Sequence, residues 1–83
     1  MNDHPKYVVT KDGEMIIFSP LLNHSQFKGL EPVSAGFISF GTDWHSNRHG
    51  ITVQCYGESV TLDIKSRMEK DELIAMKQLN LES

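Results

Sequence analysis

Two apolar runs rich in β-branched and aromatic residues surround an Asp-Gly pair in Tyr7-Val8-Val9-Thr10-Lys11-Asp12-Gly13-Glu14-Met15-Ile16-Ile17-Phe18. Asp-Gly between such runs is the strongest short signal for a β-hairpin, because glycine accepts the positive φ that a primed turn requires. The sequence therefore predicts that the fold begins with an antiparallel hairpin.

The residues after this hairpin change from strand to helix character. Ser19 can cap a helix, and Pro20 suits the first helical turn, where its missing N–H is no loss. We expect a short helix over residues 20–27, with Gly29 in the position that ends it.

Three more strands are expected in the middle of the chain. Residues 33–41 hold near-consecutive apolar side chains, which is typical of a strand buried on both faces. Residues 51–56 and 59–64 alternate between apolar and polar side chains. This alternation predicts one buried and one solvated face for each strand, with Cys55 and Val60 on the buried faces.

The final segment has the pattern of a helix. Ser66 and Glu69 fit a capping box, and Met68, Leu73, Ala75, Met76 and Leu79 cover one broad side. Ile74 falls off that side and is a candidate for contact with a partner. The order is then ββαβββα. The simplest architecture is α+β, with a largely antiparallel sheet of about five strands and two helices packed on one face.

Length and composition indicate one globular domain. The 83 residues suffice for a single domain, 1–83, whose first five residues we expect to be flexible. Cys55 is the only cysteine, so no intramolecular disulfide can form. The N-terminus lacks a signal-peptide pattern and no apolar run approaches membrane-spanning length. We therefore expect a cytoplasmic protein without a membrane partner.

The charge balance argues against nucleic acid as the main partner. Acidic residues outnumber basic ones 11 to 8, and the net charge is −3. A duplex-binding module of this size normally carries a basic stripe. Binding to nucleic acid remains an alternative in which aromatic and basic side chains stack on bases or contact phosphates, using Trp44, Tyr56, Arg48, Lys65 and Arg67.

The most suggestive cluster precedes the strand at Ile51, in Gly41-Thr42-Asp43-Trp44-His45-Ser46-Asn47-Arg48-His49-Gly50. His45 and His49 are four residues apart and, with Asp43, are candidate metal ligands. A full site needs a third ligand from Asp43, Cys55 or His24. Glycine at both ends indicates instead a connecting loop whose polar groups bond to their own backbone and to water.

A metal-dependent enzyme built on this loop is thus a second alternative. We assign no catalytic residue, no metal and no cofactor. A cysteine on a buried strand face is inert, because burial disfavours its thiolate. The glycines are dispersed and open no helix, so the chain has no phosphate-binding loop.

Three short stretches carry a resemblance to a known group of proteins: Pro32-Val33-Ser34-Ala35-Gly36-Phe37, Tyr56-Gly57-Glu58-Ser59-Val60 and Lys65-Ser66-Arg67. They look like segments of small uncharacterised proteins from phage and prophage regions, and the similarity spans about residues 6–79. The resemblance implies no chemistry and no site. It implies a compact cytoplasmic accessory protein that acts by binding another protein.

A protein–protein interaction module is therefore the expected function. The loop offers Trp44 and Arg48, which are favoured anchor types, together with His45 and His49; Ile74 is a secondary contact. A homodimer through a sheet edge or the C-terminal helix is also expected, because open edges can pair and a thin core gains from added burial.

Overall fold

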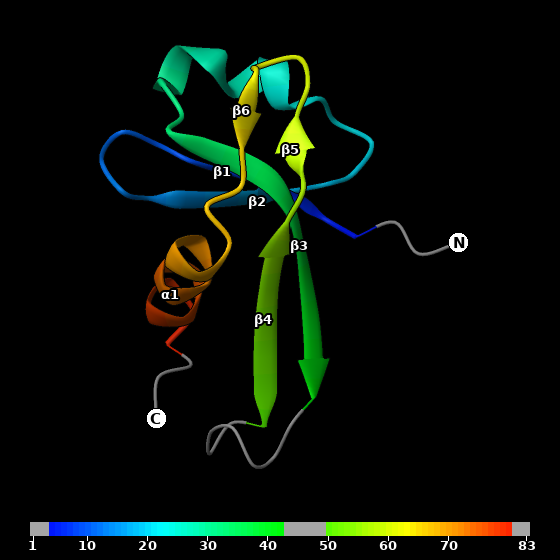
Figure 1. Cartoon of the computed structure of the whole chain (residues 1–83), viewed down its shortest axis with the longest axis vertical. Helices are drawn as coiled ribbons and strands as arrows, with labels where there is room; N and C mark the ends of the chain where they lie inside the picture. Colours follow the sequence, from blue (N-terminus) through cyan, green and yellow to red (C-terminus); the bar gives the residue numbers. More distant parts are fainter. Residues whose placement is uncertain (1–3, 43–49, 81–83) are drawn as a thin grey trace.

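The computed structural model describes residues 4–42 and 50–80, and they form an α+β fold (Figure 1). A four-stranded antiparallel sheet has the order β2-β1-β3-β4, and a two-stranded sheet pairs β5 with β6. The strands are β1 (Lys6–Val9), β2 (Met15–Phe18), β3 (Ser34–Thr42), β4 (Ile51–Tyr56), β5 (Glu58–Ser59) and β6 (Ile64–Lys65). The helices are the 3-10 helix η1 (His24–Leu30) and the α-helix α1 (Glu69–Gln78). The predicted fold class and the opening hairpin are confirmed.

Strand β3 joins two hairpins into one bent sheet. Its first part, Ser34 to Phe37, pairs with β1, and its second part, Phe37 to Thr42, pairs with β4. Figure 1 shows the consequence: β3 curves from a course beside β1 to a course beside β4. The far part of β3 and β4 therefore extends beyond β1 and β2 as a two-stranded ribbon.

The two helices cover opposite faces of this sheet. Tyr7 and Val8 follow one another in β1, so their side chains point to opposite faces. Tyr7 belongs to a cluster that includes Ala75 of α1, whereas Val8 belongs to a cluster that Phe27 of η1 and Ile64 of β6 pack against. The expectation of two helices on one face is wrong. It fails because β1 is apolar on both sides, so that both faces need a cover.

The predicted strand over 59–64 is two short strands separated by a turn. The N–H of Asp63 donates to the carbonyl of Val60 at 3.3 Å, and Asp63 has a φ of 55°. The hydroxyl of Ser59 accepts from the N–H of Leu62. Because the chain turns here, the strand alternation does not apply, and Val60 is 85% exposed instead of buried. The single five-stranded sheet is replaced by sheets of four and two strands.

The first helix begins later than predicted and is a 3-10 helix. Ser19 Oγ accepts from the N–H of Leu21, which makes a local turn and not a helix cap. The N-cap is Asn23, whose side chain accepts from the N–H of Ser25 at 3.4 Å. Gly29 does not end the helix; Glu31 does, in the left-handed conformation.

The outward and inward sides of α1 also differ from the predicted pattern. Asp71 and Ala75 are buried, and Ile74 packs against the core, whereas Leu73 is 68% exposed. The residue at the N-cap is Met68, and it makes no side-chain capping bond, so the predicted capping box does not form. Within the described ranges, no helix is both long and apolar enough to cross a membrane.

Candidate functional site

The loop residues predicted as contacts or metal ligands lie outside the described residues. These are Asp43, Trp44, His45, Arg48 and His49. Their described neighbours, Thr42 and Gly50, stand at the far end of the β3–β4 ribbon, away from η1 (Figure 1). A contact or metal role for this loop remains a prediction.

The two residues considered as a third metal ligand lie apart from each other and are already engaged. Cys55 is in the cluster beneath α1, while His24 lies on the opposite face against Phe18. Burial raises the pKa of the Cys55 thiol to about 12, with Asp71 and Glu72 adding to the shift, so the thiol stays protonated. Among residues 4–42 and 50–80, no three His, Cys, Asp or Glu side chains form a group that could hold a metal.

The residues of the nucleic-acid alternative do not form one surface within the described chain. Tyr56 stacks on Phe37 and its hydroxyl bonds to His4 Nδ1. Arg67 donates its Nε–H to Asp71 at 3.0 Å, and Lys65 is exposed opposite Glu58 in the small sheet. Arg67 is therefore committed to a buried carboxylate and not held out toward a phosphate.

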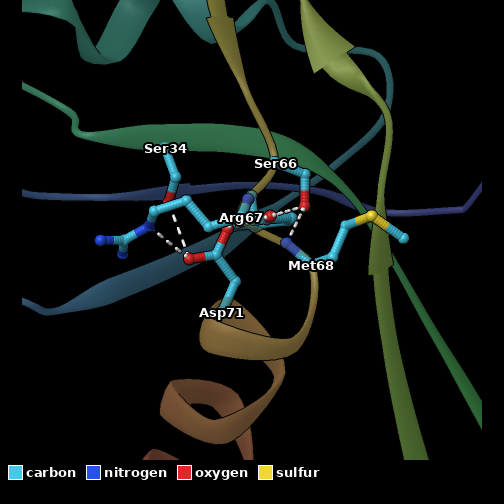
Figure 2. Close-up of polar contacts among 6 residues, drawn as sticks. Ser34, Ser66, Arg67, Met68 and Asp71 are labelled. Carbon is cyan, nitrogen blue, oxygen red and sulfur yellow. Dashed lines mark hydrogen bonds and ion pairs between the residues drawn. The ribbon is translucent and has the colours of Figure 1, made fainter.

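A buried polar cluster joins α1 to the sheet, and sequence reasoning missed it. Asp71 is fully buried and accepts four hydrogen bonds. The donors are the Tyr7 hydroxyl at 2.5 Å, the Ser34 hydroxyl at 2.9 Å, and the backbone N–H and Nε–H of Arg67 at 2.9 and 3.0 Å. Figure 2 shows Ser34 and Arg67 converging on the Asp71 carboxylate. Each carboxylate oxygen has two donors, which is what a buried charge requires.

This cluster holds the fold together and does not build a nucleophile. The Tyr7 hydroxyl also bonds to Ser66 Oγ at 2.5 Å, so Ser66, Tyr7 and Asp71 form a chain that superficially looks like a catalytic relay. Burial is the first cause that raises the pKa of Tyr7, and Asp71 is the second. Tyr7 therefore keeps its proton near neutral pH and cannot serve as a base for Ser66.

The only sequence signal for the cluster was weak. Asp71 follows Arg67 by four residues, a spacing that favours ion pairs along a helix. That spacing is equally common on solvated helix faces. The burial of Asp71 depends on Tyr7 and Ser34, which are far away in the sequence and could not be placed beside it in advance.

Met68 occupies a strained backbone position at the edge of the cluster. Its φ of 48° and ψ of −107° match the first central position of a type II′ turn, which favours glycine. The N–H of Lys70 closes the turn on the carbonyl of Arg67 at 3.1 Å, and the N–H of Met68 donates to Ser66 Oγ. The Met68 side chain points away from Asp71 and is 56% exposed (Figure 2).

We expect Met68→Gly to stabilise the protein. Removing the Cβ relieves strain of about 1–3 kcal/mol, and the added entropy of an unfolded glycine cancels about 0.5–1 kcal/mol of that gain. The free energy of unfolding should rise by about 1 kcal/mol in urea denaturation. Met68→Ala is the matched control, because it removes the same exposed side chain and keeps the Cβ. A gain with Met68→Ala as large as with Met68→Gly would show that the backbone is not the cause.

Side chains of α1 occupy backbone groups at both edges of the main sheet. Gln78 donates from Nε2 to the carbonyl of Met15 at 2.6 Å and accepts from its N–H at 2.8 Å, which imitates a neighbouring strand at β2. Glu72 accepts from the N–H of Cys55 in β4 at 2.9 Å. Natural sheets often protect their edges against pairing with other chains. At these positions, the expected dimer through a sheet edge is obstructed.

Large apolar side chains are exposed mainly around η1. Of nine such side chains in the described residues, four lie in this helix or in its two connections, namely Leu21, Leu22, Leu30 and Val33. A fifth, Val60, lies in the β5–β6 turn, which bonds to the start of the helix. We call these five residues the η1 surface. Leu21 and Val60 are 92% and 85% exposed, and a hydrogen bond of 3.1 Å between Asn23 and Thr61 ties their two segments together. Such clustering on one end of a small domain is typical of a contact surface.

Comparisons with protein-family models, with curated proteins and with solved structures found no match for this chain.

Proposed function

We propose that this chain is a protein-binding module without catalytic activity, and that it binds through the η1 surface. The observation that carries the proposal is the exposure of Leu21 and Val60. Both are large aliphatic side chains on tied segments at the end of the molecule where η1 lies (Figure 1). Desolvating them on binding would contribute about 1.5–3 kcal/mol for each side chain.

The partner in this proposal is a second copy of the chain. A two-fold axis through the η1 surface brings the same apolar residues together from both copies. Exposed Lys28 lies in the later part of η1. Exposed Asp63 lies in the β5–β6 turn, which Thr61 ties to Asn23 at the start of η1. A two-fold axis perpendicular to η1 exchanges these two ends, so in this proposed orientation Lys28 of one copy faces Asp63 of the other. Opposite charges at the rim of an apolar surface favour one orientation of the two copies.

The other surfaces that we considered support a dimer less well. Gln78 and Glu72 occupy backbone groups of the two sheet edges. On α1, the exposed Leu73 has exposed charged residues three and four positions away, namely Glu69, Lys70 and Lys77. An isolated exposed leucine of this kind is normal on a soluble protein. An accessory role of the phage or prophage type, and a cytoplasmic location, belong to the same proposal.

Sedimentation equilibrium over a range of concentrations tests the proposal. We expect the unchanged protein to form dimers. The double variant Leu21→Ser/Val60→Ser should weaken the dimer by at least about a hundredfold, because each change removes apolar burial from both copies. Both side chains are exposed in the single chain, so its stability should barely change.

Two control variants locate the contact. Leu73→Ser removes another exposed leucine and should leave the dimer intact. The pair Trp44→Ala and Arg48→Ala tests the loop that the sequence favours. If the loop variants weaken self-association and the Leu21→Ser/Val60→Ser variant does not, the contact is made by the loop and the proposal is wrong. A protein that stays monomeric at every concentration also contradicts the proposal.

A further inference from the structure

His24, the first residue of η1, is buried between the helix and the sheet. Its side chain is 4% exposed, and Nε2 lies 2.9 Å from the carbonyl oxygen of Gly36 in β3. A carbonyl only accepts, so Nε2 carries the proton, and the neutral ring has its lone pair on Nδ1. Phe18 and Phe37 meet the imidazole edge to face, with ring centroids at 5.4 and 6.1 Å. A second proton on this ring would place a cation among apolar neighbours.

The surroundings of His24 disfavour this cation. Burial is the first cause that lowers the pKa of His24; the Gly36 carbonyl acts in the opposite direction, and the Lys6 ammonium lowers the pKa further. Lys6 is held close by, because its Nζ donates to the carbonyl of Leu22 at 2.9 Å. The other ionisable side chains near η1 are Lys28, Glu31 with Lys11, Tyr56 with His4, Glu58, Asp63 and Lys65. Tyr7 of β1 and Cys55 of β4 belong to the cluster on the opposite face. The Lys6 ammonium adds to the effect of burial on the pKa of His24.

The other contacts that hold η1 are one half-buried ring pair and polar contacts at exposed sites, among them the ion pair between Lys11 and Glu31 at the C-cap. Phe27 packs against Phe18 with ring centroids at 4.4 Å, and Asn23 bonds to Thr61 at an exposed site. A 3-10 helix has poorer hydrogen-bond geometry than an α-helix, so this seven-residue segment contributes little order of its own. His24 is the only residue of η1 that is buried.

We propose that His24 is an acid-sensitive latch: its neutral ring fixes η1 to β3, and protonation releases η1 and disperses the η1 surface. The effect on self-association rests on the function proposed above, whereas the release of η1 does not. In acid the second proton at Nδ1 turns a buried neutral ring into a cation beside Lys6. Freeing η1 returns that ring to water. Leu21, Leu22 and Leu30 then lose the fixed positions that a two-fold contact needs.

The direction of the pH effect follows from linkage. The pKa of His24 is lower in the folded protein than the ordinary value of 6.5, so the unfolded or released state binds the proton more tightly. The stabilising effect of neutral His24 is complete above about pH 6.5 and is lost as the pH falls toward the lower folded value. Protection of η1 should therefore decrease on acidification and return on neutralisation.

Amide hydrogen exchange at about pH 7.5 and pH 5.5, corrected for intrinsic rates, measures the latch directly. We expect the protection of the Gln26 and Glu31 amides, which bond within η1 and at its end, to fall by about tenfold for each unit of pKa difference. The Ile38 amide, which donates to Pro5 beside the main sheet, should keep its protection. His24→Gln retains an N–H donor for Gly36 but does not titrate, so it should abolish the pH dependence.

Two further variants test whether the pH dependence comes from His24 itself. His4→Gln removes the other described histidine and should leave the exchange profile unchanged. Lys6→Gln keeps a donor near Leu22 and removes the repelling charge, so it should move the release of η1 to lower pH even if His24→Gln does not fold. An identical pH profile in wild type and His24→Gln, or equal loss of protection at Gln26 and Ile38, overturns the latch. Acid release of η1 in a protein that is monomeric at every pH would support the latch and contradict the proposed dimer.

Discussion

Asp71→Ala is expected to be among the most damaging single substitutions in the protein. It leaves the buried hydroxyls of Tyr7 and Ser34 without their acceptor, and each buried unsatisfied group costs about 1–3 kcal/mol. Arg67 is partly exposed and can bond to water instead. We expect the free energy of unfolding to fall by about 3 kcal/mol, and the thermal midpoint by roughly 12–24 °C.

Two matched variants separate the hydrogen bonds from the charge. Asp71→Asn keeps the shape and one oxygen acceptor, but its amide N–H groups meet donors at the other oxygen site. The free energy of unfolding should therefore fall by less than with Asp71→Ala. Glu14→Ala removes an exposed carboxylate and should change stability by less than about 0.5 kcal/mol. A loss below about 1 kcal/mol for Asp71→Ala in chemical denaturation would contradict the role of the cluster.

Gly36→Ala is the second large expected effect. A Cβ at this position would lie 2.4 Å from the backbone oxygen of Tyr56 and 3.1 Å from Cβ of Ser66. The backbone oxygen cannot rotate away as a flexible side chain would, so β3 and β4 must separate. Overpacking of this kind costs about 1–3 kcal/mol or more, and we expect a loss of stability near the upper end of that range.

Gly29→Ala is the natural control for this substitution. A Cβ at Gly29 meets nothing within 4 Å, and the residue has no positive φ, so alanine there should be neutral or stabilise by up to about 1 kcal/mol. In urea denaturation, we expect Gly36→Ala to lower the free energy of unfolding and Gly29→Ala to leave it unchanged or raise it. If both substitutions were neutral, the close approach of Tyr56 to Gly36 would be wrong.

Local patterns predicted the parts of the fold that depend on local contacts. The Asp12-Gly13 hairpin and the buried positions of Val53 and Cys55 in β4 followed from turn chemistry and alternation. The same alternation led to a wrong strand prediction over 59–64, because apolar and polar residues of a four-residue turn can alternate by chance. The predicted start of a helix at Pro20 is wrong because Ser19 bonds to its own turn, and the helix begins after Asn23.

Non-local features of the candidate site could not be predicted from the sequence. The four-residue spacing of Arg67 and Asp71 gives no sign that Asp71 is buried, and only the sheet brings Tyr7 and Ser34 beside it. Leu21 was expected within a helix and Val60 within a strand, so no sequence pattern indicated that they would be exposed together in the η1 surface. The sequence suggested His24 only as a possible metal ligand. Its hydrogen-bond partner, the carbonyl of Gly36, lies in β3 and could not be assigned to it from the sequence.

Chemical-shift mapping of backbone amides against protein concentration tests the binding surface most directly, because it locates the contact without any substitution. From the proposed contact we expect shifts that grow with concentration at Leu21, Leu22 and Val60, and unchanged shifts at Leu73, Thr42 and Gly50. Concentration-dependent shifts confined to Thr42 and Gly50, or none up to millimolar protein concentration, would contradict it.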